Sequence, residues 1–405
     1  MVTALERGGS ADRLASCNCN ALTHRGVRAF TTIRRTFVAV LGAGHGGMAL
    51  AAYLARNGHH VHLWNRSQAR VDPVASLGGV RLTLPGAAST IQPIVLATSN
   101  LAAAVSGAKV ILVAVPASGH AEVARACAPY LRGGQTVLLL PGRTGGALEF
   151  RRVLQDSGCR AEIVLGEANT FPLASRTIGP AEAVVFGDKA ELTAAALPAR
   201  DTGRLIASCR DVLPMLTAAP SVLHTSLSNL GAILHPTILL LNAGRIERGE
   251  VFDFYTDGVT SRVAQVLTAA DAERLRIASA HGERVQSLQE WIAAAYGHQG
   301  DTLQDAVAGN PSYVGIKAPT TLQHRYLHED VPTGLVPLIE LASAAGLAVP
   351  TLRSLVTLAE FTLQRSDWPG ERSLATLGLD CMSIAEIRRV VASGFASQVR
   401  RSGSR

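Results

Sequence analysis

The sequence contains no apolar stretch long enough to cross a membrane, which takes about eighteen or more consecutive apolar residues. Its best candidates, VILVAVPA and TVLLLPG, are short and bounded by turn residues, so they predict buried parallel strands. Charged residues are also scarce, at 17% of 405 residues, whereas 47% of the residues are hydrophobic. This length and composition predict two or three well-packed globular domains without membrane attachment.

Lysine is rare as well, because only three of the 38 basic residues are lysines. The formal net charge is +7, but residues 1–35 contain six arginines and two acidic residues, a local charge of +4. The remaining residues therefore carry +3, which is 7 minus 4, and they form no basic stripe with interleaved aromatic residues. The net charge thus gives no reason to expect a nucleic-acid partner.

The six cysteines are scattered along the chain. Only Cys17 and Cys19 lie close together, and neither a second pair nor a histidine cluster accompanies them. A structural zinc site needs about four such ligands, so we expect no bound metal. Free thiols of this kind are typical of a reducing compartment, and we predict a cytoplasmic location.

Residues 1–35 lack the apolar segment of a secretory signal. We expect an unstructured extension here, and an over-extended start codon is equally compatible with the sequence. The arginine, serine and threonine content with few acids also imitates an organelle transit peptide. We expect residues 396–405 to form a short tail.

From Phe37 onward the sequence alternates between strand-like and helix-like segments. The stretch FVAVLGAGHGGMALAAYLARNGHHVHLW predicts a strand, a glycine-rich turn, a helix and a second strand. Further strand-like runs are VILVAVP, TVLLLPG, AEIVLGE and AVVFG. This alternation predicts an α/β domain over 36–200 with a doubly wound, mostly parallel sheet.

After Pro198 the strand-like runs stop, which predicts an all-α domain over 201–395. The expected helical segments are 202–218, 221–247, 259–296, 334–346 and 351–363.

Gly42, Gly44 and Gly47 form a G-x-G-x-x-G pattern in the first turn. The first glycine permits a tight turn, the second lets the backbone approach a pyrophosphate, and the third lets the helix pack on the strand. The N-terminus of the following helix supplies N–H groups and a favourable dipole for phosphate. Because strand, turn, helix and second strand follow in order, the sequence predicts a Rossmann domain that binds a dinucleotide. A glycine-rich turn without a ligand is the alternative.

The residues WNRS at the end of the second predicted strand indicate which dinucleotide binds. NAD enzymes usually carry Asp or Glu here, about twenty residues after the glycines, to bind the ribose 2′-hydroxyl. Asn65 removes the carboxylate that would repel a 2′-phosphate, and Arg66 and Ser67 can bind one. We therefore predict that NADP(H) is preferred and that NAD(H) can also bind. The alternative is that Arg66 is a solvated surface residue.

Four further residues are predicted to line the cofactor site. His45 and Gly46 lie inside the glycine turn, and Val115 and Pro116 end the run VILVAVP. His45 would lie at the pyrophosphate, too far from the nicotinamide for proton transfer. We therefore favour a packing role for its side chain within the loop.

Eight stretches of the sequence together resemble the octopine/nopaline (opine) dehydrogenase family. They run in the family's order from about residue 37 to 365, and such a set is specific. The arginine-rich N-terminal residues and the last residues fall outside it, and His45 stands where relatives often carry Asn. The stretches are VLGAGHGGMA, VAVPASGHAEVA, LLPGRTGGALEF, GEANTFPLASR, LSNLGAILHPTILLLNAGRIE, FDFYTDGVTSRVAQVL, DAERLRIA and RYLHEDVPTGLVP.

This resemblance implies a Rossmann domain followed by an all-helical opine dehydrogenase domain. The implied activity is the NAD(P)H-dependent reductive condensation of an amino acid or amine with a 2-oxo acid, which yields an N-(carboxyalkyl) amino acid. The family's catalytic histidine and aspartate fall on His235 and Asp330. Its arginine for the substrate carboxylate falls on Arg325.

The types of these residues agree with that chemistry. Reduction of an imine needs a proton donor, and a histidine can both supply the proton and activate the amine. An adjacent carboxylate would fix the histidine tautomer, and an arginine binds a carboxylate through two parallel hydrogen bonds. Each residue also has a structural alternative. His235, in the apolar stretch LSNLGAILHPTILLLN, could be a core histidine, and Arg325 and Asp330 could form only a local ion pair.

Two more residues are candidates for substrate binding. Asn229 precedes His235 on the same predicted helix, where it could hydrogen-bond the substrate or the nicotinamide amide, or only pack. Arg143 follows a predicted strand, at the edge of the sheet where open α/β domains bind ligands. It could contact phosphate or substrate, or stabilise the turn.

Two other functions are compatible with a dinucleotide domain followed by helices. Glycerol-3-phosphate and ketopantoate types of reductase share the domain order but use lysine in the helical domain, where this chain has only Lys317. A non-catalytic NADP(H)-sensing protein is the second alternative. We expect small-molecule substrates and no nucleic-acid or membrane partner, and a homodimer is compatible with the sequence. The sequence does not identify the amine or the 2-oxo acid.

Overall fold

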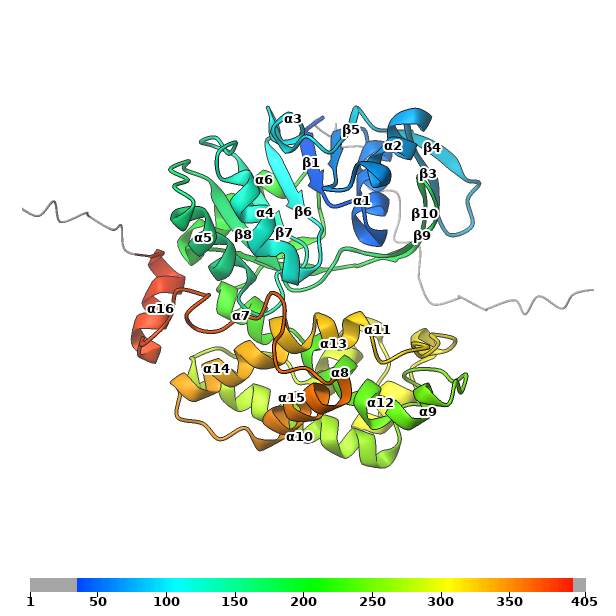
Figure 1. Ribbon diagram of the computed structural model, residues 1–405, viewed down its shortest axis with the longest axis vertical. Coiled ribbons are helices and arrows are strands. Elements are labelled where there is room, and N and C mark those ends of the chain that lie inside the picture. The colour runs from blue at the N-terminus through cyan, green and yellow to red at the C-terminus, as the bar shows by residue number, and fades with distance from the viewer. Residues whose placement is uncertain (1–34, 396–405) are drawn as a thin grey trace, which may run out of the picture. The chain divides into compact units, whose positions relative to one another are not determined.

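The computed structural model describes residues 35–395 of the chain. Cys17, Cys19, the predicted extension up to residue 34 and the predicted tail lie outside these residues. The described chain consists of two sheets with their helices, followed by a group of helices (Figure 1). None of the helices in this range is both long enough and apolar enough to span a bilayer.

The larger sheet has eight strands in the order β12-β11-β8-β7-β6-β1-β2-β5. All neighbouring strands pair in parallel except β8 and β11. The prediction of a doubly wound, mostly parallel sheet is confirmed. The strands are β1 (Phe37–Leu41), β2 (His60–Trp64), β5 (Leu96–Thr98), β6 (Val110–Val113), β7 (Thr136–Leu139), β8 (Val164–Ala168), β11 (Leu192–Ala196) and β12 (Leu216–Ala218).

Both faces of this sheet are covered, which explains why its strands are continuously apolar. Val38 and Val40 of β1 enter one hydrophobic core, and Ala39 and Leu41 enter another on the opposite face. The first core contains residues of α1, and the second contains residues of α3, α4 and α5. The helices of this half are α1 (His45–Arg56), α2 (Gln68–Leu77), α3 (Leu101–Val105), α4 (His120–Cys127), α5 (Gly146–Asp156) and α6 (Thr202–Cys209).

A second sheet of four strands, in the order β4-β3-β10-β9, was not expected from the sequence. The run AVVFG, which we assigned to the parallel sheet, lies in β10 and pairs antiparallel with β9. This hairpin lies beside α1 (Figure 1). The strands are β3 (Gly79–Thr83), β4 (Thr90–Pro93), β9 (Leu173–Gly179) and β10 (Glu182–Asp188).

The helix predicted over 202–218 is wrong in its second half. Helix α6 ends at Cys209, and Leu216–Ala218 form strand β12, which pairs in parallel with β11. Pro214 lies between the two elements, and proline is incompatible with a helix interior. The large sheet therefore continues past the boundary that we placed at residue 200.

The remaining described chain is helical, as predicted, but the segments 221–247 and 259–296 are not single helices: the first contains α7, α8 and α9, and the second contains α10 and α11. Helix α8 is buried on nearly all sides, which explains its almost wholly apolar sequence. It packs against α10, α15 and a π-helical turn, η4 (Val331–Leu335). The helices are α7 (Val222–Leu227), α8 (Gly231–Leu241), α9 (Ala243–Glu247), α10 (Ser261–Ala280), α11 (Leu288–Tyr296), α12 (Leu303–Ala308), α13 (Arg325–His328), α14 (Val336–Ala344), α15 (Pro350–Leu363) and α16 (Ile384–Ser393).

The glycine turn between β1 and α1 leaves no room for side chains at two of its three positions. Gly42 has a φ of 118°, and a Cβ atom there would lie 2.6 Å from the carbonyl oxygen of Ala114. A Cβ atom on Gly47 would lie 1.8 Å from the carbonyl oxygen of Gly42. Nothing lies within 4 Å of a Cβ atom on Gly44, so that position faces open space.

We expect Gly47→Ala to destabilise the protein and Gly44→Ala to leave its stability unchanged. A Cβ atom on Gly47 forces α1 away from the turn, which should lower the melting temperature by about 5 °C or more. Differential scanning calorimetry without added cofactor measures both variants against the parent. Equal melting temperatures for Gly47→Ala and the parent would contradict this account of the turn.

Candidate active site

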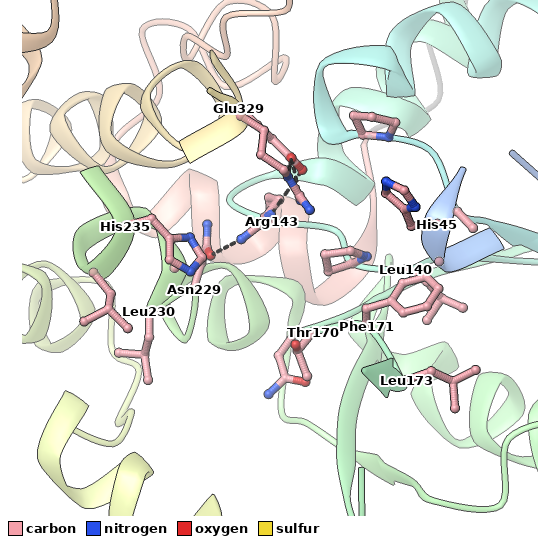
Figure 2. A pocket seen from close by; sticks show the side chains of 18 of the residues that line it. His45, Leu140, Arg143, Thr170, Phe171, Leu173, Asn229, Leu230, His235 and Glu329 are labelled. Carbon is pink, nitrogen blue, oxygen red and sulfur yellow. Dashed lines mark hydrogen bonds and ion pairs between the residues drawn. The ribbon is translucent and has the colours of Figure 1, made fainter. Parts of the chain in front are cut away.

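A cavity of about 670 Å³ lies beyond the carboxyl ends of β1, β6 and β7. Ligands of open α/β sheets bind at this edge. Residues of the helical half close the other side of the cavity (Figure 2). Nine of the predicted site residues line it: Gly44, His45, Gly46, Val115, Pro116, Arg143, Asn229, His235 and Arg325.

The glycine turn fits the pyrophosphate of a dinucleotide. Gly44 leaves open space next to the cavity, and it is the N-cap of α1 without a side-chain hydrogen bond to the helix. Because glycine has no side chain, the N-cap residue provides no side-chain acceptor for the first N–H groups of α1. Free N–H groups at a helix N-terminus bind phosphate.

The residues predicted to select the cofactor lie together directly after β2. The side chain of Asn65 accepts a hydrogen bond from the backbone N–H of Ala43 at 3.0 Å and donates one to the carbonyl oxygen of Ser67 at 3.3 Å. Arg66 is exposed and pairs with Glu122, with Nη1 at 2.5 and 2.6 Å from the two carboxylate oxygens. Asn65 thus joins the glycine turn to this segment, and Arg66 occupies the protein surface beside α4.

His45 lines the cavity, but its ring is also tied to the second sheet. Its Nδ1 accepts a hydrogen bond from the backbone N–H of Thr177 in β9 at 3.0 Å. Partial burial, followed by the charges of Arg176, Arg70 and Arg325, lowers the pKa of this histidine. The neutral ring with the proton on Nε2 fits these contacts, so His45 fastens β9 to the turn.

His235 and Asp330 lie side by side, although 95 residues separate them in the sequence. The His235 Nδ1 atom is 2.8 Å from Asp330 Oδ2, and the imidazole stacks on the ring of Tyr326 with centroids 4.2 Å apart. Asp330 is only 1% exposed, whereas the His235 side chain is 19% exposed and lines the cavity. This arrangement fixes the ring and leaves Nε2 for a ligand.

Arg143 lies between Asn229 and Glu329 (Figure 2). Its Nη1 is 3.0 Å from Asp330 Oδ1, and its Nε is 3.4 Å from Glu329 Oε1. Burial lowers the pKa of the guanidinium, but Asp330 and Glu329 outweigh that effect and raise it. Arg143 is therefore the buried cation that balances both carboxylates.

Both the oxygen and the nitrogen of the Asn229 side-chain amide form hydrogen bonds with protein groups. Its Oδ1 accepts a 3.4 Å hydrogen bond from Arg143, and its Nδ2 donates to Thr144 Oγ1 at 3.2 Å. The residue lines the cavity, yet these contacts indicate that it orients Arg143.

Glu329 is a residue of the site that the sequence analysis missed. It accepts hydrogen bonds from Arg325, from Nη2 at 2.7 Å and Nε at 3.0 Å, and one from the backbone N–H of Ala117 at 3.4 Å. Burial would raise the pKa of Glu329, but Arg143 and Arg325 hold it well below its usual range. The one signal in the sequence was its place directly before Asp330.

Arg325 differs from Arg143 in being accessible. Its side chain is 61% exposed, and it reaches the cavity from the start of α13. Its Nε and Nη2 atoms bond a single oxygen of Glu329, which leaves Nη1 without a bond to this carboxylate. It is therefore the more available of the two arginines for an external carboxylate.

An apolar and aromatic wall closes the helical side of the cavity, and sequence reasoning did not find it. Tyr255 and Tyr313 stack with ring centroids 4.3 Å apart, and Tyr296 packs edge-on against Tyr313. Among the described residues that line the cavity, Glu329 is the sole acid. The wall consists of Leu230, Leu234, Tyr255, Trp291, Tyr296 and Tyr313.

Within residues 35–395, no group of three or more histidine, cysteine or acidic residues could hold a metal ion. Cys127 and Cys209 are buried as free thiols, and burial raises the pKa of each to about 12. Thiols with so high a pKa are unreactive at neutral pH.

Two family models match the chain. Residues 218–363 match the alpha-helical domain of NAD/NADP octopine/nopaline dehydrogenase. Residues 37–142 match the N-terminus of NAD-dependent glycerol-3-phosphate dehydrogenase.

Similar proteins and solved structures agree with the first of these models. An octopine dehydrogenase of Pecten maximus is 27% identical over 286 residues, which cover 64% of this chain and 70% of that protein. The structure of an octopine dehydrogenase with NADH and L-arginine superposes with a TM-score of 0.72 at 24% identity, covering 87% of this chain and 97% of the other. The structure of yersinopine dehydrogenase with NADP+ superposes with a TM-score of 0.67 at 18% identity, covering 88% of this chain and 99% of the other. These likenesses confirm the predicted fold.

The family follows from a more similar relative. An opine dehydrogenase of Arthrobacter sp. (strain 1C) is 40% identical to this chain over 353 residues, which cover 87% of this chain and 98% of that protein. The chain belongs to the octopine/nopaline (opine) dehydrogenase family of NAD(P)-dependent oxidoreductases.

Proposed function

We propose that this protein condenses the amino group of an amino acid or amine with a 2-oxo acid and reduces the resulting imine. The observation that carries this proposal is the His235–Asp330 pair, which lies at a cavity between the glycine turn and an exposed arginine. The 40% identity to an opine dehydrogenase supports the same reaction.

The reductase alternative is not favoured. Lys317, the one lysine in the helical half, pairs with Asp253 at 2.6 Å and does not line the cavity. The match to glycerol-3-phosphate dehydrogenase is confined to residues 37–142, which is the dinucleotide-binding part. A sensing role without catalysis leaves the His235–Asp330 pair at the cavity unexplained.

His235 is suited to move the protons of this reaction. Its Nδ1 is held by Asp330, so its Nε2 can accept a proton from the incoming ammonium group and return it during reduction. Loss of water from the carbinolamine then gives the imine, and bound NAD(P)H supplies the hydride. The carboxylate of Asp330 stabilises the imidazolium that forms in between.

Arg325 is placed to bind the carboxylate of the 2-oxo acid. Arg143 is less suited, because Asp330, Glu329 and Asn229 already surround its guanidinium. Arginine pairs with carboxylate through parallel N–H groups, which also orients the keto carbon. We expect a small 2-oxo acid such as pyruvate.

The wall of leucine and aromatic side chains favours an amine partner with an apolar side chain. A basic side chain in this place would meet Glu329, but that carboxylate is already balanced by Arg143 and Arg325. Burying a charge without a partner costs several kcal/mol. The cavity therefore disfavours basic amino acids, and an acidic side chain would compete with the 2-oxo acid for Arg325.

A cofactor-oxidation screen tests the proposed function. Leucine, phenylalanine, arginine and aspartate are each combined with pyruvate, 2-oxoglutarate or glyoxylate, and condensed products are detected by mass. We expect an apolar amino acid with pyruvate to give a kcat/KM at least about tenfold above that of arginine. Oxidation without a condensed product would contradict the reaction, and a preference for arginine or aspartate would contradict the assignment of the wall.

His235→Ala should lower kcat by about a hundredfold or more, because the reaction loses its proton donor. The dissociation constant of NAD(P)H should stay within about twofold, since His235 lies across the cavity from His45 of the glycine turn (Figure 2). Nucleotide fluorescence titration and steady-state kinetics measure the two quantities. His298→Ala, which removes a histidine outside the cavity, is the control and should keep the parent kcat. A small change in kcat for His235→Ala would remove this residue from the mechanism.

We propose NADP(H) as the preferred cofactor, with Arg66 as the partner of the 2′-phosphate. In the structure Arg66 forms an ion pair with Glu122, so the 2′-phosphate of NADP(H) must displace the Glu122 carboxylate from Arg66. Arg66→Ala should lower kcat/KM for NADPH about tenfold and leave that for NADH unchanged. Glu122→Gln should raise the value for NADPH. Arg125→Ala removes an exposed positive charge from the same helix as Glu122 and serves as the control. A parent preference for NADH of tenfold or more would overturn the proposal.

A further inference from the structure

We infer that Arg372 is a positioning residue for the proposed reaction, because it fastens the backbone on both sides of Arg143 and so holds the Arg143 guanidinium against Asp330. The inference rests on the proposed function. Arg372 lies after α15, in the segment that leads to α16, and outside residues 218–363 that match the helical-domain model.

The contacts of Arg372 converge on the loop that follows β7. Its Nη1 donates to the carbonyl oxygens of Gly142 and Thr144, both at 2.9 Å. These carbonyls flank Arg143, whose φ of 60° lies in the left-handed region that residues other than glycine rarely adopt. A conformation of this kind persists only where surrounding contacts enforce it. Arg372 supplies two such contacts from outside the loop.

The other nitrogen atoms of the Arg372 guanidinium also donate hydrogen bonds. Nε donates to Glu149 at 3.0 Å, and Nη2 donates to the carbonyl oxygen of Ala117 at 3.2 Å and to Nδ1 of His120 at 3.0 Å. Burial, followed by the charge of Arg372, lowers the pKa of His120, so its neutral ring can accept this bond. All five N–H groups of a fully buried arginine thus have protein acceptors.

This use of every donor explains why arginine and not lysine suits the position. A planar guanidinium can bridge two carbonyl oxygens with one nitrogen while its other nitrogens reach different segments. A lysine ammonium has three donors at a single point and cannot span Gly142, Thr144 and Ala117 together. The backbone N–H of Arg372 itself donates to the carbonyl oxygen of Pro332 at 3.0 Å, inside the turn that follows Asp330. Arg372 therefore contacts the loop of Arg143 and the turn after Asp330 at once.

The effect reaches the proposed proton carrier through Arg143. Asp330 is shared between His235 at 2.8 Å and Arg143 at 3.0 Å. If the loop after β7 relaxes and Arg143 moves away, His235 remains as the only one of these two partners of the Asp330 carboxylate. Its full charge then favours the protonated imidazole, and a histidine that keeps its proton accepts one poorly from the amine.

The first test compares Arg372→Lys with Arg274→Lys. Arg274 is the matched control because it is also fully buried and also bonds carbonyl oxygens, those of Leu227 and Gln286, but it does not touch the Arg143 loop. Both variants should lose thermal stability. Arg372→Lys should lower kcat at least about tenfold with the NAD(P)H dissociation constant within about twofold, whereas Arg274→Lys should keep kcat within about twofold.

The second readout does not require activity. The groups next to His235 are Asp330, Tyr326 and His324, and Arg143 pairs with the second oxygen of Asp330. In Arg372→Lys the NMR titration of the His235 ring, assigned by comparison with His235→Gln, should move to higher pH than in the parent protein. Arg274→Lys should leave this titration in place. The acidic limb of the kcat/KM profile should move in the same direction.

A double-mutant cycle with Arg143→Lys tests whether Arg372 acts through Arg143. The double variant should be about as slow as Arg143→Lys alone, because two changes in one chain of contacts do not add. If Arg372→Lys fails to fold, Glu149→Gln serves as the second variant, because it removes the charge partner of Arg372. It should lower kcat about threefold and leave the NAD(P)H dissociation constant unchanged.

A folded Arg372→Lys protein with the parent kcat and the parent His235 titration would overturn the inference, as would additive effects in the cycle or the same shift in Arg274→Lys. A parent protein that forms no condensed product contradicts the proposed function instead. The NMR titration then still decides the role of Arg372.

Discussion

The burial of two consecutive carboxylates, Glu329 and Asp330, is the constraint on which the rest of the site depends. They are 4% and 1% exposed, and a buried carboxylate without a partner costs several kcal/mol. Arg143 contacts both, while Arg325 pairs with Glu329 and His235 with Asp330. The loop after β7, helix α8 and helix α13 must therefore meet at one point. Arg143, His235, Arg325 and Glu329 also line the cavity.

Backbone groups hold this meeting point together as much as side chains do. The π-helical turn after Asp330 exposes carbonyl oxygens that an α-helix would use internally, and π-helical turns occur frequently at functional sites. Thr333 accepts a hydrogen bond from the N–H of Thr144, and Pro332 accepts one from Arg372. Asp330 thus keeps its place beside His235 because the turn that follows it is bonded to the loop after β7 and to Arg372.

Local patterns were enough to predict much of this protein. The glycine turn, the parallel strands and the helical segments each depend on spacing within a few residues, and the structure contains them. Strand β12 escaped prediction because it has only three residues. The AVVFG run of β10 was recognised as a strand, but its place in a second sheet depends on its pairing with β3 and β9, which the local pattern does not record. Glu329, Arg372 and the aromatic wall were missed for another reason. Their roles arise from contacts between distant segments, and neither composition nor periodicity records such contacts.

The sequence by itself determined the dinucleotide turn and the family, since Gly42, Gly44 and Gly47 act within one turn and the matching motifs follow each other along the chain. Only the tertiary structure decided where His235 lies. Its apolar helix is equally compatible with a core histidine, and the deciding contact is with Asp330, 95 residues away. The same holds for Arg143, whose strand-end position fits a substrate contact as well as a buried counter-ion. Folding surrounds it with Asp330, Glu329 and Asn229, and that enclosure makes it the counter-ion of the site.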